Sequence, residues 1–319
     1  MRCSETDPCR ATARGRRPTR FLIVAALLAL PATARAADPA DSVTCPDGVN
    51  HHRDKAVVLL VHGTATTAEE TWPLGFGKSL HGAGFDWCMV QLPDREMGDI
   101  QASNTYVTAA VKYLAKRTHR KVSLAGHSQG GLQVRWAVRW FPAVRKHVDD
   151  VITFAGANDG VYSASGVCSA GSCFPSAWQM SVGSKLEAAL NRRPMPKGPS
   201  YTAIWSDTDE LVQPTSSGQF AGASSVHIQG ICPGRYVGHV QQVFDAVAIS
   251  AALDALEHKG PADLKRIGTG ACTQVYGPGI DPAQATAAIS TLYANAAAAV
   301  ARAPTVNAEP PLRPYATQG

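Results

Sequence analysis

Residues 121–140 read KVSLAGHSQGGLQVRWAVRW and contain the feature that decides the fold, a serine between two glycines. The first five residues predict a strand, and the apolar spacing over Gln129–Trp140 predicts a helix that ends before Pro142. Gly126-His127-Ser128-Gln129-Gly130 lies between them and matches G-x-S-x-G. A strand, this motif and a helix in succession are typical of a sharp turn that exposes the serine hydroxyl. Ser128 is therefore the candidate nucleophile.

Further strands and helices alternate on both sides of this turn. Apolar, β-branched runs predict strands at 56–61, 85–92, 151–154, 201–205 and 225–229. Helical spacing of apolar residues predicts helices at 104–117 and 240–256, whereas 37–54 is expected to be irregular. This alternation predicts an α/β fold, in which a mostly parallel central sheet is flanked by helices.

Residues 1–36 have the layout of a signal peptide. Four arginines within 14–20 precede an unbroken apolar run at 21–30, and Ala34-Arg35-Ala36 follows as a cleavage site. The alternative is a retained membrane anchor, but the run is shorter than the roughly 20 residues that a spanning helix needs. We expect residues 37–319 to form a single mature domain with no membrane span, exported to the periplasm or the extracellular space.

Removal of this leader changes the charge of the chain. The 30 basic residues fall to 23 and the 25 acidic residues also to 23, since the leader holds seven Arg together with Glu5 and Asp7. The formal net charge then drops from +5 to zero, which argues against a nucleic-acid partner.

Six cysteines remain after Cys3 and Cys9 leave, an even number that suggests three disulfides in an exported protein. Their spacing fits no zinc site, so no metal is expected.

A serine nucleophile needs a general base, and three histidines follow Ser128 at a distance along the chain. His227 lies inside an expected strand and His258 at an expected helix end, which favour structural roles. His239 lies in a loop just before a helix and is the favoured base. For the acid that orients it, Asp207 and Asp209 both follow the 201–205 strand, and their spacing does not separate them.

An oxyanion hole requires donors close to the nucleophile. The backbone N–H of Gln129 is expected to supply one donor, because it follows the serine. The loop His62-Gly63-Thr64 after the first core strand is expected to supply the other, through the backbone N–H of Thr64 and its hydroxyl.

Two segments are expected to cover the pocket. Residues 156–199 are rich in Gly and Ser, include a short helix at 185–190, and are predicted to form a lid or cap insertion over one end of the sheet. Residues 283–303 are dominated by Ala and predict a helix whose small side chains suit close packing over the pocket. The alternative for this helix is an ordinary packing role.

The chain resembles the secreted serine lipases of the Candida antarctica lipase B family, which have the α/β-hydrolase fold. The resemblance rests on LVHGTATT at 60–67, SDTDELVQP at 206–214, and the Ala-rich helix with EPPLRPY at 309–315. It implies that Asp209, and not Asp207, is the catalytic acid. It also implies that Thr64 and Gln129 form the oxyanion hole and that Leu211 and Val212 line the substrate pocket.

The resemblance further implies the disulfides Cys45–Cys88 and Cys232–Cys272. The family's third bridge, near the C-terminus, is absent, and Cys168–Cys173 is expected as an extra bridge within the insertion. The C-terminal tail is therefore expected to be less restrained and the lid more so. His62 and His127 replace a Pro and a Trp of the yeast enzyme.

Together these features predict a carboxylic-ester hydrolase that works through a Ser128–His239–Asp209 acyl-enzyme mechanism without a cofactor. The expected substrate is a triacylglycerol or another acyl ester, taken at a lipid–water interface. A short-chain esterase, a polyester depolymerase and, least favoured, a non-catalytic binding module are the alternatives.

Overall fold

The buried run VVLLV forms β2 (Val57–Val61), the strand that leads to the oxyanion loop. In the computed structural model, which describes residues 39–317, all five side chains are fully buried. Val58 and Leu60 pack into the core on one face of the sheet, and Val57, Leu59 and Val61 into the core on the other. A strand buried on both faces belongs in the middle of a parallel sheet covered by helices on each side.

Seven strands form the sheet in the order β1-β3-β2-β4-β5-β6-β7. All neighbouring pairs are parallel except β1 and β3. Besides β2, the strands are β1 (Val43–Thr44), β3 (Trp87–Val90), β4 (Val122–His127), β5 (Val148–Phe154), β6 (Ser200–Trp205) and β7 (Ser224–His227). The predicted α/β architecture, a mostly parallel sheet flanked by helices, is thus confirmed.

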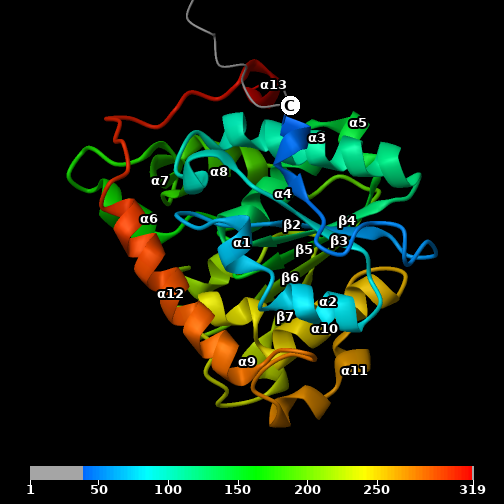
Figure 1. Ribbon diagram of the computed structural model, residues 1–319. Helices are drawn as coiled ribbons and strands as arrows, with labels where there is room; N and C mark the ends of the chain where they lie inside the picture. Colours follow the sequence, from blue (N-terminus) through cyan, green and yellow to red (C-terminus); the bar gives the residue numbers. More distant parts are fainter. Residues whose placement is uncertain (1–38, 318–319) are drawn as a thin grey trace, which may run out of the picture. The chain divides into compact units, whose positions relative to one another are not determined.

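Helices cover both faces of the sheet (Figure 1). The helices α3 (Ile100–Thr118) and α4 (Gln129–Trp140) pack on one face, and α2 (Phe76–Gly82) and α10 (Ala246–Glu257) on the other. Shorter helices connect the elements: α1 (Ala68–Thr71), α5 (Pro142–Arg145), α9 (Ile228–Ile231) and α11 (Leu264–Ile267), with 3-10 turns η1 (Pro39–Ser42), η2 (Pro93–Glu96), η3 (Thr215–Gly218), η4 (Val240–Val243) and η5 (Gly270–Thr273).

Several expected element boundaries differ from the structure: the expected strand 225–229 ends at His227, and the expected helix 104–117 begins at Ile100. The expected helix 240–256 is two elements, η4 and α10, because the Asp245 side chain accepts hydrogen bonds from the N–H groups of Val247 and Ala248 and starts a new helix there. The expected irregular segment 37–54 contains β1, which pairs antiparallel with β3.

The segment after β5 contains three helices rather than the single short helix expected: α6 (Tyr162–Cys168), α7 (Pro175–Met180) and α8 (Lys185–Asn191). Pro175 occupies the first turn of α7, where its missing N–H costs nothing. These helices share a third hydrophobic core, which also includes Leu132 and Trp136 of α4.

The Ala-rich segment forms α12 (Pro282–Val300), which begins at the cap residue Asp281. Only Ala285 and Leu292 of this helix are buried. Figure 1 shows α12 extending past α6, and the chain then running on to α13 (Pro314–Thr317) near α3.

The three disulfides form as expected, Cys45–Cys88, Cys168–Cys173 and Cys232–Cys272. The C-terminal tail, which was expected to be less restrained than in the family, makes several contacts with the rest of the domain. Val306 exchanges two backbone hydrogen bonds with Cys173, and the Glu309 carboxylate accepts the N–H groups of Lys185 and Leu186 at the start of α8. The Tyr315 ring lies 5.2 Å from that of Phe141. Polar and aromatic contacts therefore restrain the tail without a disulfide.

The chain divides into two units, Met1–Ala36 and Ala37–Gly319. The expected signal peptide, with Cys3 and Cys9, lies outside the described residues. No helix within residues 39–317 has the length and apolarity needed to cross a membrane.

Candidate active site

The turn between β4 and α4 holds Ser128 in a strained conformation. Its φ of 56° and ψ of −126° lie where non-glycine residues rarely occur, and such strain is concentrated at functional sites. The Ser128 N–H bonds to the carbonyl of Phe154 at 2.9 Å, which anchors the turn to β5. The hydroxyl is thereby presented beyond the carboxyl end of β4, just before the N-terminus of α4.

The glycines around the serine permit a close approach of three chain segments. A Cβ at Gly130 would lie 2.1 Å from the carbonyl oxygen of Val61, and one at Gly126 would lie 2.2 Å from that of Gly130. A Cβ at Gly63 would lie 2.8 Å from the Cβ of Ser128. The loop of Gly63 and the turn of Ser128 can therefore touch because both contain glycine.

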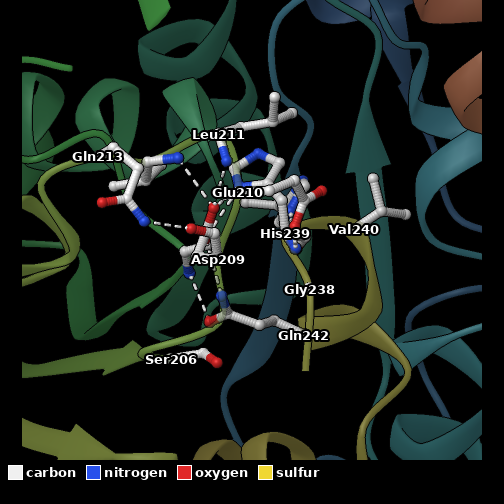
Figure 2. Close-up of polar contacts among 12 residues, drawn as sticks. Ser206, Asp209, Glu210, Leu211, Gln213, Gly238, His239, Val240 and Gln242 are labelled. Carbon is white, nitrogen blue, oxygen red and sulfur yellow. Dashed lines mark hydrogen bonds and ion pairs between the residues drawn. The ribbon is translucent and has the colours of Figure 1, made fainter. Parts of the chain in front are cut away.

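The structure brings Asp209 and His239 together from two distant loops (Figure 2). The two carboxylate oxygens of Asp209 lie 3.1 and 3.0 Å from Nδ1 of His239, and both side chains are almost fully buried. The carboxylate also accepts the N–H groups of Leu211 and Val212 and the amide of Gln242. Four donors thus hold it in one orientation.

This environment shifts both pKa values toward the charged pair. Burial pushes the pKa of Asp209 upward, but the charge and hydrogen bond of His239 and the two backbone N–H groups outweigh it, so the net pKa is lowered. Burial likewise depresses the pKa of His239, but the charge of Asp209 and its hydrogen bond overcome this, and the net pKa is raised. The pair thus favours an imidazolium, the form that a general base adopts after taking a proton.

The backbone of His239 is fixed as well. Its N–H donates to Oε2 of Glu210 at 2.9 Å, and its carbonyl accepts from Nε2 of His127 at 3.1 Å. The other oxygen of Glu210 accepts from the hydroxyl of Tyr293 on α12. Glu210 therefore links the Ala-rich helix to the histidine loop.

The rival candidates lie elsewhere. His227 stacks on Trp205 with ring centroids 4.2 Å apart and pairs with the half-exposed Asp207 at 2.8 Å. His258 follows the end of α10, where its Nδ1 contacts the carbonyl of Asp254.

Ser128 and His239 line one pocket with Thr64, Leu211 and Val212. In the described part of the chain no hydrogen bond joins the Ser128 hydroxyl to the His239 ring, although both residues line this pocket. The pocket has a volume of about 320 Å³ and receives Val161, Ala164, Phe174 and Met180 from the insertion and Leu292 and Val300 from α12. Its walls are mainly apolar, as expected for a site that accepts an acyl chain.

The expected oxyanion residues lie side by side. The Thr64 hydroxyl donates to Oε1 of Gln129 and lies 3.8 Å from the sulfur of Met180. The Gln129 side chain is fully buried, whereas its N–H is at the start of α4, where negative charge is favoured.

Three residues around the site were given no role there by the sequence analysis. Gln242, Glu210 and His127 reach Asp209 and His239 only through the tertiary fold. Burial lowers the pKa of His127 to about 3 and that of His62 to about 4, so both rings stay neutral. No group of three or more His, Cys, Asp or Glu side chains within residues 39–317 is placed to hold a metal ion.

Comparisons with known proteins show what the chain is similar to. Residues 57–195 match the palmitoyl protein thioesterase family model. Lipase B of Pseudozyma antarctica is 31% identical over 271 residues, which are 81% of this chain and 78% of that protein.

Solved lipase structures are also similar to this chain. Aspergillus fumigatus lipase B superposes with a TM-score of 0.79 at 28% identity, covering 94% of this chain and 77% of that one. Bacillus licheniformis lipase BlEst2 in its mature form, with a TM-score of 0.51, 16% identity and coverage of 58% and 89%, shares the fold. The chain belongs to the lipase B family of α/β-hydrolases and is a carboxylic-ester hydrolase.

Proposed function

We propose that the protein hydrolyses acyl esters through a covalent acyl-enzyme on Ser128. The Ser128 hydroxyl attacks the ester carbonyl while Nε2 of His239 takes its proton and then passes it to the leaving alcohol. Asp209 fixes the tautomer of His239 and stabilises the imidazolium. Water then attacks the acyl-enzyme by the same route. The observation that carries this proposal is the buried Asp209–His239 pair, because His239 lines the same pocket as the strained Ser128.

The proposed oxyanion hole consists of the Gln129 N–H together with the backbone N–H and hydroxyl of Thr64. Gly63 packs against Ser128, so the Thr64 loop is held close to the nucleophile. Donors fixed before the reaction cost no reorganisation when charge develops on the substrate oxygen.

We propose a triacylglycerol, presented at a lipid–water interface, as the substrate. Residues 160–184 and 282–301, which flank the pocket, contain no Asp, Glu, Lys or Arg. Tyr162, Val167, Leu211 and Val300 on this side of the molecule are substantially exposed. Such a surface suits an uncharged, apolar substrate layer. Short-chain esters and polyesters remain alternatives, and a rate series over acyl length, with and without an emulsion, separates the three.

A second candidate is thioester hydrolysis, favoured by the match to the palmitoyl protein thioesterase model. The same acyl-enzyme would form, with a thiol as the leaving group. Parallel assays on palmitoyl esters and thioesters of matched chain length, each giving kcat/KM, decide between these substrates.

We further propose that residues 37–319 act as one catalytic domain outside the cytoplasm after removal of 1–36. The three disulfides support this, because such bonds persist in oxidising compartments. N-terminal sequencing of the exported protein tests it.

The direct test of the mechanism is Ser128→Ala, assayed on p-nitrophenyl esters with Ser165→Ala as a matched control. Ser165 lies in α6, and its hydroxyl donates to the Val161 carbonyl and accepts from the Val182 N–H. We expect Ser128→Ala to lose all measurable turnover with an unchanged thermal transition, and Ser165→Ala to keep nearly full activity. Retained activity in Ser128→Ala would refute the assignment.

A further inference from the structure

A buried carboxyl group lies behind the oxyanion loop. Glu96 is 1% exposed and ends a turn in which Asp94, Arg95 and Glu96 all have left-handed φ angles of 50°, 51° and 60°. Such strain in three successive non-glycine residues needs firm support from the surroundings. The same turn braces the oxyanion loop, because the Ala65 N–H bonds to the Arg95 carbonyl at 2.7 Å and the Arg95 side chain bonds to the Ala65 carbonyl at 2.9 Å.

One oxygen of Glu96 accepts three hydrogen bonds. Its Oε1 accepts from Nε2 of Gln129 at 2.8 Å, from the Ser103 hydroxyl at 2.9 Å, and from Nε2 of Gln133. Its Oε2 has no partner among residues 39–317, although it is buried. All three donors bond to the same oxygen of this buried carboxyl group. Protonation of the other oxygen therefore weakens these three hydrogen bonds without changing their partners.

The amide of Gln129 joins this carboxyl to the oxyanion loop. Since an ionised carboxylate only accepts, the NH₂ end of the amide must face Glu96, and its carbonyl oxygen must face Thr64. The Thr64 hydroxyl donates to that oxygen. A continuous hydrogen-bonded chain therefore connects Glu96, Gln129 and Thr64.

We propose that Glu96 is a positioning residue for the oxyanion hole, whose ionised form fixes the Gln129 amide and thereby the position of the Thr64 hydroxyl oxygen. This inference rests on the proposed acyl-enzyme mechanism. With its oxygen held in place, the Thr64 hydroxyl turns its proton to the substrate oxygen as negative charge develops there. Glu96 touches no substrate and acts only through Gln129.

The surroundings make this chain sensitive to pH. Burial, reinforced by the nearby charge of Asp99 at the start of α3, raises the pKa of Glu96 to about 7 against the pull of its hydrogen bonds. The side chains that reach it from α4 are the neutral Gln129 and Gln133, and Ser176 of α7 bonds to its backbone carbonyl. The neighbouring Arg95 turns away to Glu70. Above pH 7 the three bonds are charge-assisted and about twice as strong as in the protonated form.

The test is the ratio of wild-type kcat to that of Glu96→Gln between pH 5 and pH 9, measured on a p-nitrophenyl ester. Glutamine keeps an acceptor oxygen but no charge, so it imitates protonated Glu96. Taking the ratio cancels the titration of His239, which both proteins share. We expect the kcat ratio to be near one at pH 5 and to rise to about tenfold by pH 8.5, with KM little changed. This effect is smaller than the roughly 10²–10³-fold loss of kcat that follows removal of an oxyanion donor itself.

Asp150→Asn is the matched control. Asp150 is a second buried carboxyl, with a pKa that burial raises to about 6, and it accepts from Ser123 and Ser200 at the opposite end of β5 from Phe154. Its kcat ratio to wild type should stay flat over the same pH range.

The route of the effect is tested by Gln129→Ala, which keeps the backbone N–H of residue 129. The double variant Glu96→Gln/Gln129→Ala should have the same kcat as Gln129→Ala alone. The double variant Gln129→Ala/Thr64→Val should likewise have the same kcat as Thr64→Val alone. A kcat ratio for Glu96→Gln that does not vary with pH, or full additivity of Glu96→Gln with Gln129→Ala, would overturn the inference. These outcomes leave the mechanism intact as long as Ser128→Ala is inactive, whereas an active Ser128→Ala would refute the mechanism itself.

Discussion

Nε2 of His127, the residue before the nucleophile, donates a hydrogen bond of 3.1 Å to the backbone carbonyl of His239. The two rings lie with centroids 4.7 Å apart. Because Glu210 accepts the N–H of His239, both polar backbone groups of that residue are bonded. With Nδ1 held by Asp209, the nitrogen left to serve Ser128 is Nε2. The turn that carries Ser128 therefore helps to hold the loop of His239, its proposed base.

Asp209→Asn should lower kcat by about 10³–10⁴-fold on a soluble ester, because an amide can stabilise the wrong imidazole tautomer. Asp207→Asn is the control, since Asp207 is half-exposed and pairs with His227 away from the pocket. We expect that variant to keep kcat within about twofold of wild type, in line with the small worth of exposed ion pairs. Similar losses in both variants would disprove the assignment of Asp209 as the acid.

The pH profile of kcat/KM should rise with pH as His239 loses its proton, since only the neutral ring can act as a base. Because Asp209 raises the pKa of His239, half-maximal activity should fall above pH 6.5. The Glu96→Gln variant gives the clearest reading, because it removes the second group that titrates nearby. In Asp209→Asn the rise should move to lower pH. If the pH profile of Asp209→Asn matched that of the wild type, Asp209 would not control the pKa of His239 in solution.

Tyr293→Phe should loosen α12 without disabling the chemistry. The variant loses the bond from the Tyr293 hydroxyl to Glu210 and the one from the Val240 N–H to the hydroxyl oxygen. Hydrogen exchange of the α12 amides should therefore be faster, because each lost bond is worth about 1 kcal/mol, while kcat should change by less than about threefold. Unchanged exchange would mean that Tyr293 does not tether the helix.

Gly130→Ala should destabilise the fold at the nucleophile turn, because the new methyl group would lie 2.1 Å from the Val61 carbonyl oxygen. Either α4 or β2 must then move, and we expect both a lower Tm and a loss of activity. Gly166→Ala in α6 is the matched control, since nothing lies within 4 Å of the added carbon. That variant should be neutral or stabilised by up to about 1 kcal/mol. Thermal unfolding of both variants checks the prediction.

Local patterns sufficed for much of this molecule. The run 57–61 and the motif around Ser128 are read from neighbouring residues, and each forms the element expected of it. The loops of Asp209 and His239 also lie where the strand order implied. These features depend on periodicity and on short-range turn chemistry, which a sequence displays directly.

Other features depend on contacts between distant segments. The tail is held by Glu309 at the start of α8, a contact between residues 124 positions apart in the sequence. Glu96 is the clearest case, because a glutamate next to an arginine normally suggests an exposed loop. Its burial follows from a left-handed turn that packs it against Gln129 and Gln133.

The most direct test of the central claim is a crystal structure of the enzyme after reaction with diethyl p-nitrophenyl phosphate. We expect phosphorus bonded to Oγ of Ser128, Nε2 of His239 within hydrogen-bond reach, and the phosphoryl oxygen about 2.7–3.1 Å from the donors of Thr64 and Gln129. An unmodified Ser128, or a phosphoryl oxygen turned away from both donors, would contradict the proposed site.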